Sequence, residues 1–374
     1  MDSLDLISSK KENNFSLNKN DNKGNKLIKY IIIIFILSFF SNIYTSYSIF
    51  KLNKKVNILN INTSKNNEIN KIKNFDEDNN IEEYIKIQKN FCKYPDKFYN
   101  KKFEDLIKLT EFSFRNISFQ MYTYKKTLDG MSKEIIETSK YEPLPMSNLL
   151  DALKYYGEKK NITKNEDIFM LDIGGNLGVY PSILGKFGYS VLTFEASPRN
   201  SYIIYKNYCS LNNNSNIIII NKGLSNVEKT CSYYYQINGI GNGMVLCDEN
   251  EERTSAGQLN LQKEFEVKIT KLSNFLPYLL NKNIALIKLD IEGGEGKVME
   301  DAIELINKYH VPFIFTEFDP DYLKKQGTDP KKYLELFINN GYKISFDGFL
   351  NENYVNPKDI NSGHKNLYFI YGGN

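Results

Sequence analysis

The stretch Ile168–Gly188, IFMLDIGGNLGVYPSILGKFG, carries the pattern that decides the fold. An apolar run ends at Asp172, a cluster of small residues follows, and a second apolar run begins at Val179. This order predicts a buried strand that turns directly into a helix. The glycines also allow a ligand to approach the backbone, and the start of the following helix offers free N–H groups.

Downstream, apolar strand patterns alternate with helical ones. Strands are predicted at 168–173, 190–195, 216–221, 284–290, 311–318, 342–347 and 365–372, and helices at 179–188, 198–212, 296–309 and 330–341. Continuous apolar strands between helices indicate a parallel sheet covered on both faces. The helix-free return between the last two strands predicts that the final strand is antiparallel. The fold class is therefore α/β: a doubly wound, mostly parallel seven-stranded sheet with an antiparallel last strand.

The segment before this sheet divides into four parts. Residues 1–29 form a polar tail that we expect to be disordered and cytosolic. Residues 30–50 carry no charge and are long enough to cross a ~30 Å hydrocarbon core, which predicts a single N-terminal transmembrane helix acting as a signal-anchor. A cleaved signal peptide is the rival interpretation. Lysines are denser before this span than after it, which favours a type II orientation with the rest of the chain across the membrane.

Residues 51–80 are expected to form a polar stem and 81–160 a helical cap, followed by the main domain at 161–374. Apolar residues recur at helical spacing in 81–91, 103–112 and 146–157, whereas 117–124 alternates like a strand. Residues 223–270 are largely polar and contain glycines, with a strand-like piece at 264–270.

Composition excludes some classes of function. The chain has 374 residues, of which 41% are hydrophobic, and a formal net charge of +3. Because no basic cluster is interleaved with aromatic residues, we expect no nucleic-acid partner. Cys92, Cys209, Cys231 and Cys247 allow one or two disulfides in an oxidising lumen, in three full pairings among which the sequence does not choose. No close Cys/His spacing indicates a metal site.

In doubly wound sheets, ligands bind at the carboxyl ends of the strands, at the switch point. This rule selects Asp172, Gly174, Asn176 and Gly178 after the first strand, Glu195 after the second and residues 223–226 after the third. It also selects Asp290 and Glu292 after the fourth strand and Glu317 at the end of the fifth.

The glycine turn departs from the dinucleotide pattern because Asn176 stands at the second glycine position. An acid at Asp172 repels a phosphate but suits a cationic amino group. Glu195 follows at close to the ~20-residue offset of an acid that binds ribose hydroxyls. Together these residues favour S-adenosylmethionine over NAD. The alternative is that Asp172 caps a helix and Glu195 is a solvated strand end.

The motif IKLDIEGGEGKVMEDA places Asp290, Glu292 and Glu295 near the end of one buried strand. Such carboxylates are costly unless they are solvated, paired or used. One of them could be a general base for a substrate hydroxyl, or the set could hold a divalent metal. Glu295 is interpreted as the start of the next helix, where its charge favours the dipole.

The motifs LDIGGNLGVY, LTFEASPRN, NKGLSN and IALIKLDIEGGEGKVMEDA, in that order, resemble the FkbM-type methyltransferase family over about residues 117–371. The resemblance implies a Rossmann-like domain that transfers a methyl group from S-adenosylmethionine, usually to a hydroxyl. It also implies cofactor contacts at Asp172, Gly174, Asn176, Gly178 and Glu195, with Ser225 near the adenine and Glu142 near the cofactor. Gly175, in the same loop, is a further cofactor-binding candidate, although it and Ala196 stand where the family usually has Ala and Pro.

The base that accepts the hydroxyl proton is expected among Asp290, Glu292, Glu317 and His364, whereas His310 precedes a strand and is expected to be structural. The leading hypothesis is an O-methyltransferase of the endoplasmic reticulum or Golgi lumen that acts on a glycan or lipid-linked sugar. A second hypothesis is a type II membrane glycosyltransferase that uses Asp319 and Asp321. A third is a catalytically silent binding protein of the same fold.

Overall fold

The computed structural model describes residues 79–211, 216–248, 260–360, 363 and 365–372. The tail at 1–29, the predicted span at 30–50, the stem up to residue 78 and His364 all lie outside the described residues. Among the helices that are described, none has both the length and the apolar character needed to cross a membrane.

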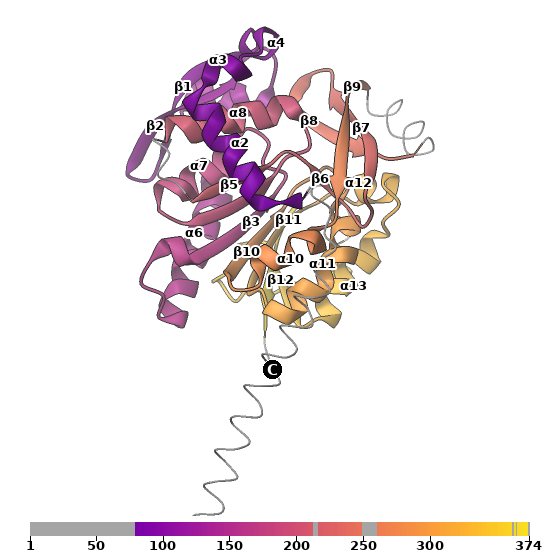
Figure 1. Ribbon diagram of the computed structural model, residues 1–374. Helices are drawn as coiled ribbons and strands as arrows, with labels where there is room; N and C mark the ends of the chain where they lie inside the picture. Colours follow the sequence, from indigo (N-terminus) through magenta and orange to yellow (C-terminus); the bar gives the residue numbers. More distant parts are fainter. Residues whose placement is uncertain (1–78, 212–215, 249–259, 361–362, 364, 373–374) are drawn as a thin grey trace, which may run out of the picture. The chain divides into compact units, whose positions relative to one another are not determined.

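A seven-stranded sheet forms the centre of the described unit (Figure 1). Its strands are β3 (Ile168–Ile173), β4 (Ser190–Phe194), β5 (Ile217–Ile220), β10 (Asn283–Leu289), β11 (Phe313–Phe318), β12 (Tyr342–Ser345) and β13 (Lys365–Tyr371). Their spatial order is β12-β13-β11-β10-β3-β4-β5. β13 is antiparallel to both of its neighbours, and the pairs from β11 to β5 are parallel. The predicted fold class and its antiparallel last strand are confirmed.

Helices cover both faces of this sheet, as Figure 1 shows. One face carries α6 (Pro143–Lys160), α7 (Val179–Lys186) and α8 (Pro198–Ser210), whose apolar side chains share a core with Met170 and Phe315. The other face carries α10 (Leu276–Leu279), α11 (Glu295–Tyr309), α12 (Pro320–Lys325) and α13 (Pro330–Asn339), in a second core with Leu171 and Ile287. Because both faces are covered, every residue of β3 is buried.

A second sheet of four strands stands beside the carboxyl end of the first. It contains β6 (Gly223–Leu224), β7 (Lys229–Gln236), β8 (Gly239–Leu246) and β9 (Leu261–Thr270), in the order β6-β9-β7-β8. The sequence predicted only the end of β9. The glycines and polar residues of β8 resemble a loop, but they form strand pairs with β7, so tertiary pairing outweighs the weak local propensity.

The segment before β3 corrects one prediction. Helices α2 (Ile81–Lys93), α3 (Pro95–Phe98), α4 (Lys101–Glu104), α5 (Gly130–Thr138) and α6 agree with a mainly helical cap. The helix predicted at 103–112 is wrong, because β1 (Ile107–Phe114) pairs there with β2 (Ile117–Tyr124) as an antiparallel hairpin. The alternation of Phe112 and Phe114, both buried, outweighs the apolar residues that happen to lie at helical spacing.

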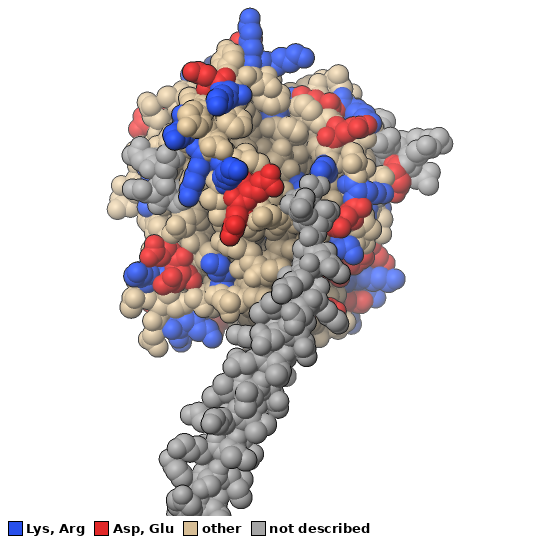
Figure 2. Space-filling view, viewed as in Figure 1, with Lys and Arg blue, Asp and Glu red and all other residues tan. Residues whose placement is uncertain are grey.

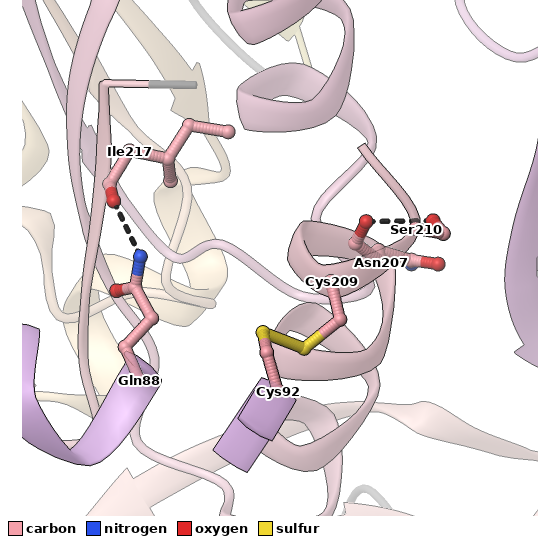
Figure 3. Close-up of a disulfide and its surroundings, with 6 residues drawn as sticks. All are labelled: Gln88, Cys92, Asn207, Cys209, Ser210 and Ile217. Carbon is pink, nitrogen blue, oxygen red and sulfur yellow. Dashed lines mark hydrogen bonds between the residues drawn. A yellow bond between two sulfur atoms is a disulfide. The ribbon is translucent and has the colours of Figure 1, made fainter. Parts of the chain in front are cut away.

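Two side-chain amides attach this cap to the sheet and to the glycine turn. Gln88 of α2 donates to the carbonyl of Ile217 at 2.8 Å (Figure 3). It also accepts the N–H of Ile219 at 3.2 Å, so it pairs with the edge strand β5 as another strand would. Asn207 of α8 accepts the N–H of Tyr122 of β2 at 2.6 Å and donates to the carbonyl of the same residue at 3.0 Å. Its amide also donates to the carbonyl of Leu177 at 2.9 Å. The cap is therefore bonded to the loop that follows β3.

All four cysteines are paired, as Cys92–Cys209 and Cys231–Cys247. The first disulfide joins α2 to the last turn of α8, next to the Gln88 contact (Figure 3). The second closes a short loop between β7 and the residue after β8. The first disulfide thus links the cap covalently to α8, and the second links two neighbouring strands of the second sheet.

We expect the double substitution Cys92→Ser/Cys209→Ser to lower the free energy of unfolding by about 2–4 kcal/mol, because the link closes a loop of 117 residues in the unfolded chain. Urea unfolding of the full-length protein measures this loss. The Cys231→Ser/Cys247→Ser pair, which closes only 16 residues, is the matched control and should lose less. Equal midpoints for wild type and the first variant would contradict the role of this disulfide in fastening the cap.

Candidate active site

The switch point of the main sheet lies between β3 and β10, which are adjacent and parallel. The chain continues from β3 to β4 and β5 on one side, and returns through β10 and β11 on the other. A cavity lies at this carboxyl edge, which is where ligands bind in doubly wound sheets. Of the predicted residues it is lined by Gly174, Asn176, Glu195, Ser225, Asp290 and Glu292.

The glycine turn is built so that its backbone stays close to the two neighbouring strands. The N–H groups of Gly174 and Gly175 both donate to the carbonyl of Phe194, at 3.0 Å. Gly174 has a φ of +96°, and a Cβ there would lie 1.9 Å from the carbonyl oxygen of Asp290. A Cβ at Gly175 would lie 2.4 Å from Oγ1 of Thr193, which gives a physical reason for glycine where the family usually has Ala.

Glu195 closes the next strand and is almost fully buried. Its Oε2 accepts the N–H of Asn176 at 2.7 Å, and its Oε1 accepts the N–H of Ser197 at 2.8 Å. Burial raises the pKa of this carboxyl to about 7, against the lowering effect of the two N–H donors. The solvated strand end is therefore the wrong interpretation. Each oxygen keeps a lone pair, and the carboxyl borders the cavity where ribose hydroxyls would need an acceptor.

Asn176 gives a direct test of whether the site suits a cofactor. Its Oδ1 is buried and has no hydrogen-bond partner in the described part of the chain, although the residue lines the cavity. Buried acceptors of this kind are normally satisfied. The site therefore fits S-adenosylmethionine: Gly174 gives a cradle that a Cβ would fill, and Glu195 and Asn176 offer acceptors to hydroxyl or ammonium donors.

Lys288 of β10 is a site residue that the sequence reasoning missed. It is buried, and its Nζ lies 3.1 Å from Oδ2 of Asp290, 3.5 Å from Oδ1 of Asp172 and 3.0 Å from the carbonyl of Gly174, to which it donates. The ring of Tyr180 covers it at 5.2 Å. Burial alone would lower the pKa of Lys288, but the carboxylates of Asp290 and Asp172 raise it above its ordinary value.

Asp172 stays behind the cavity wall and does not border it. It lies between Thr193 and Lys288 in the strand register, and Thr193 donates to its Oδ2 at 2.7 Å. Burial raises its pKa, whereas Lys288 lowers it. The carboxylate therefore acts through Lys288 and the glycine turn, and the structure shows no capping contact from it to α7.

Carboxyl groups gather around Asp290, which follows β10 beside the glycine turn. Glu292 has a φ of +58° and lies in the loop between Asp290 and α11, and burial together with Asp290 and Glu295 raises its pKa. Glu295 begins α11 as predicted, and its Oε1 accepts the N–H of Ile291 at 2.8 Å. Burial raises its pKa to about 7. Glu317 lies on β11, next to Asp290 across the strand pair, and does not border the cavity.

Glu142 lies on the same side of the sheet but outside the cavity wall. It precedes α6 with a φ of 41°, and its Oε2 accepts the hydroxyl of Tyr180 at 2.6 Å. Burial raises its pKa, and that hydrogen bond lowers it. The ring of Tyr180 also covers Lys288. Glu142 therefore interacts with the site indirectly, by accepting the hydroxyl hydrogen bond of Tyr180.

The second sheet supplies the opposite wall, which the sequence did not predict. Its apolar part combines Phe194 with Leu224, Val245 and Ile269, and Ser225 follows Leu224 at the edge of this surface. Ser225 is held by its N–H, which donates to the carbonyl of Thr270 at 2.9 Å. An apolar wall beside a hydroxyl is a surface on which an adenine ring could pack, and the adenine contact of Ser225 stays a prediction.

A buried arginine fixes this wall. Arg199 of α8 donates to the carbonyl of Ile240 at 2.8 Å and to the hydroxyl of Tyr124 at 3.0 Å, and it forms an ion pair with Glu264 of β9. Asn200 donates to the carbonyl of Gly241 at 3.0 Å. These contacts hold the start of β8 against α8 and the cap, and so position the cavity wall that β8 supplies.

The remaining candidates do not join this cavity. His310 ends α11 and stacks on Tyr371 at 5.1 Å, as expected for a structural residue. Asp319 caps α12 by accepting the N–H groups of Asp321 and Tyr322. Asp321 is exposed, and among the described residues no group of acids, histidines or cysteines is arranged to hold a metal ion.

Residues 172–344 match the family model described as the methyltransferase FkbM domain. No curated protein matches the chain. Solved structures with a similar fold include magnesium protoporphyrin IX methyltransferase from Synechocystis PCC 6803 with bound S-adenosylmethionine, at 9% identity and a TM-score of 0.34, over 66% of this chain and 85% of that one. Another is a precorrin-6y C5,15-methyltransferase from Geobacter metallireducens GS-15, at 11% identity and a TM-score of 0.29, over 59% and 86%.

The family match and the cavity together define an S-adenosylmethionine-dependent methyltransferase. More narrowly, the chain carries a domain of the FkbM methyltransferase family, which the matched residues place from β3 to β12. The alternatives of a glycosyltransferase and of a catalytically silent protein are not supported. Asp319 has a structural role as a helix cap, and the matching family is one of methyltransferases.

We expect Gly174→Ala to weaken S-adenosylmethionine binding by more than about tenfold, since the new Cβ would displace the Asp290 carbonyl and a φ of +96° strains any other residue. Isothermal titration calorimetry on the full-length protein measures the affinity. Gly239→Ala is the matched control, because nothing lies within 4 Å of its Cβ position. Wild-type affinity in Gly174→Ala would contradict this expectation, because it would show that the glycine turn accommodates a Cβ without loss of binding.

Proposed function

We propose that this methyltransferase acts on oxygen and methylates a hydroxyl group of a glycan or a lipid-linked sugar. The observation that carries the proposal is the pair of carboxyl groups of Asp290 and Glu292, which line the cavity where β10 ends beside the glycine turn. Carboxylates accept hydrogen bonds from hydroxyl groups, and several hydroxyls on one sugar ring match several acceptors.

When bound, S-adenosylmethionine supplies a methyl group on a positively charged sulfur that needs no further activation. The protein orients the acceptor oxygen in line with that methyl group and removes the hydroxyl proton. An oxygen–methyl bond forms as the sulfur–methyl bond breaks, and the proton passes to a carboxylate of the chain.

Glu292 is the carboxyl best suited to receive this proton. Its pKa is raised by burial and by the charges of Asp290 and Glu295, and a base is most effective when its pKa lies near the working pH. Asp290 is ion-paired with Lys288, so its role is to orient the acceptor hydroxyl. Since Glu292 must be ionised to act, the rate should rise with pH through its raised pKa.

We further propose that the chain is a type II membrane protein of the endoplasmic reticulum or Golgi, anchored by Tyr30–Phe50, with its catalytic domain in the lumen. Two observations support this. Both disulfides suit an oxidising compartment. Asn116 and Asn161, each in an Asn-X-Ser/Thr sequence, are exposed and available for glycosylation.

The test incubates the full-length protein with S-adenosylmethionine labelled in its methyl group and with glycan and lipid extracts from the source cells. We expect label in a carbohydrate-containing fraction that survives mild alkali, because methyl ethers resist hydrolysis and methyl esters do not. Glu292→Gln should lower the rate by about 10²–10⁴-fold. Asp321→Asn, an exposed acid on α12, is the control and should retain the rate. Label that is lost in alkali, or found only in protein, would refute methylation of a sugar hydroxyl.

A further inference from the structure

Glu317 was expected to serve as a base, but its surroundings are those of an acid that keeps its proton. The last paired residues of β10 and β11 are Leu289 and Thr316, so Asp290 and Glu317 follow side by side at the carboxyl edge. Side chains at these neighbouring positions are close enough to hydrogen-bond, and an interaction of this kind with Asp290 contributes to the raised pKa of Glu317. Two carboxylates cannot both be ionised and share a hydrogen bond, because one of them must supply the proton.

The charges around this pair decide which carboxyl holds the proton. Lys288 lies 3.1 Å from Asp290, on the β3 side, and so stabilises the ionised form of Asp290. Glu317 faces Asp290, Glu292 and Glu295, which all disfavour a second negative charge. Its partner across β13 is the neutral Asn366, and the charged residue next to that position, Lys365, is opposite Phe318 and extends over the ring of Phe346.

Asp319, which follows β11, adds another acid to this surface and is used as the cap of α12. Burial is the largest cause that raises the pKa of Glu317, and the neighbouring carboxylates raise it further. The geometry and the charges therefore agree on the neutral form.

We propose that Glu317 is a neutral positioning acid: its protonated carboxyl donates to Asp290 from the side opposite Lys288 and fixes the carboxylate that faces the acceptor. Asp290 is then held by an ammonium on one side and by a hydroxyl donor on the other. This inference rests on the proposed role of Asp290 at the acceptor end of the cavity, but its first test needs no acceptor.

The first test is the pH dependence of stability in Glu317→Gln, whose amide is neutral and keeps a donor. A carboxyl whose pKa is raised by folding contributes stability below its unfolded pKa, and this contribution is lost as the pH rises through its folded pKa. The wild type should therefore lose stability, relative to Glu317→Gln, as the pH rises from the ordinary Glu pKa of about 4.3 towards the folded pKa of about 11. Thermal unfolding of the full-length protein at each pH measures the widening difference in midpoint.

Glu335→Gln, an acid on the outer part of α13 that pairs with Lys331, is the matched control and should show a difference that does not grow with pH. If Glu317→Gln instead becomes less stable than the wild type as the pH rises, Glu317 is ionised in the folded protein and the proposal is overturned.

The second test compares turnover in Glu317→Ala and Glu317→Gln with the acceptor fraction identified above. We expect Glu317→Ala to lower kcat by about tenfold or more, the loss of one charge-assisted hydrogen bond, and Glu317→Gln to restore most of it. A glutamine variant as slow as the alanine variant would show that the ionised carboxylate is required, and would overturn the proposal. Because the stability test uses no acceptor, failure of the proposed glycan activity would leave it intact.

Discussion

The ion pair between Lys288 and two carboxylates is the constraint on which the rest of the site depends. A buried ammonium costs several kcal/mol unless it is paired and hydrogen-bonded. Here Nζ contacts Asp290, Asp172 and the carbonyl of Gly174. These partners come from the ends of β3 and β10, which are the two strands at the switch point. One side chain thus joins the glycine turn to the acidic end of the cavity.

This arrangement explains why the two halves of the cavity have different chemistry. In the turn after β3, Asn176 Oδ1 has no hydrogen-bond partner among the described residues, and the carboxyl of Glu195 after β4 borders the cavity, so this half suits the hydroxyl and ammonium donors of the cofactor. Beyond Lys288, the carboxyl groups of Asp290, Glu292 and Glu317 crowd together, and their mutual repulsion raises the pKa values of Glu292 and Glu317 beyond the effect of burial. Reversing one buried charge would therefore disturb both halves.

The sequence predicted the main sheet well because its strands are continuous apolar runs that local pattern reveals. The same holds for Gly174, Asn176, Glu195 and Asp290, since the carboxyl ends of parallel strands converge at one edge. Lys288 was missed because the sequence does not show which residue of β3 lies opposite it. Its ion pair with Asp172 is visible only once the strand register is known. β8 was missed because its glycines and polar residues pair with β7 against their local propensity, and β1 because its apolar residues also fit a helix. Asp172 was predicted to contact the cofactor, and the structure shows it between Lys288 and Thr193 in the strand register and outside the cavity lining.

The measurement that tests this account most directly is the S-adenosylmethionine affinity and unfolding free energy of Lys288→Met in the full-length protein. Removing the ammonium leaves Asp172 buried without a counter-charge, so we predict a loss of about 3–5 kcal/mol of stability and at least about tenfold weaker binding by calorimetry. Adding Asp172→Asn to this variant should restore much of the stability, because the buried charge is then gone. Wild-type affinity and stability in Lys288→Met would contradict the claim that this ion pair organises the site.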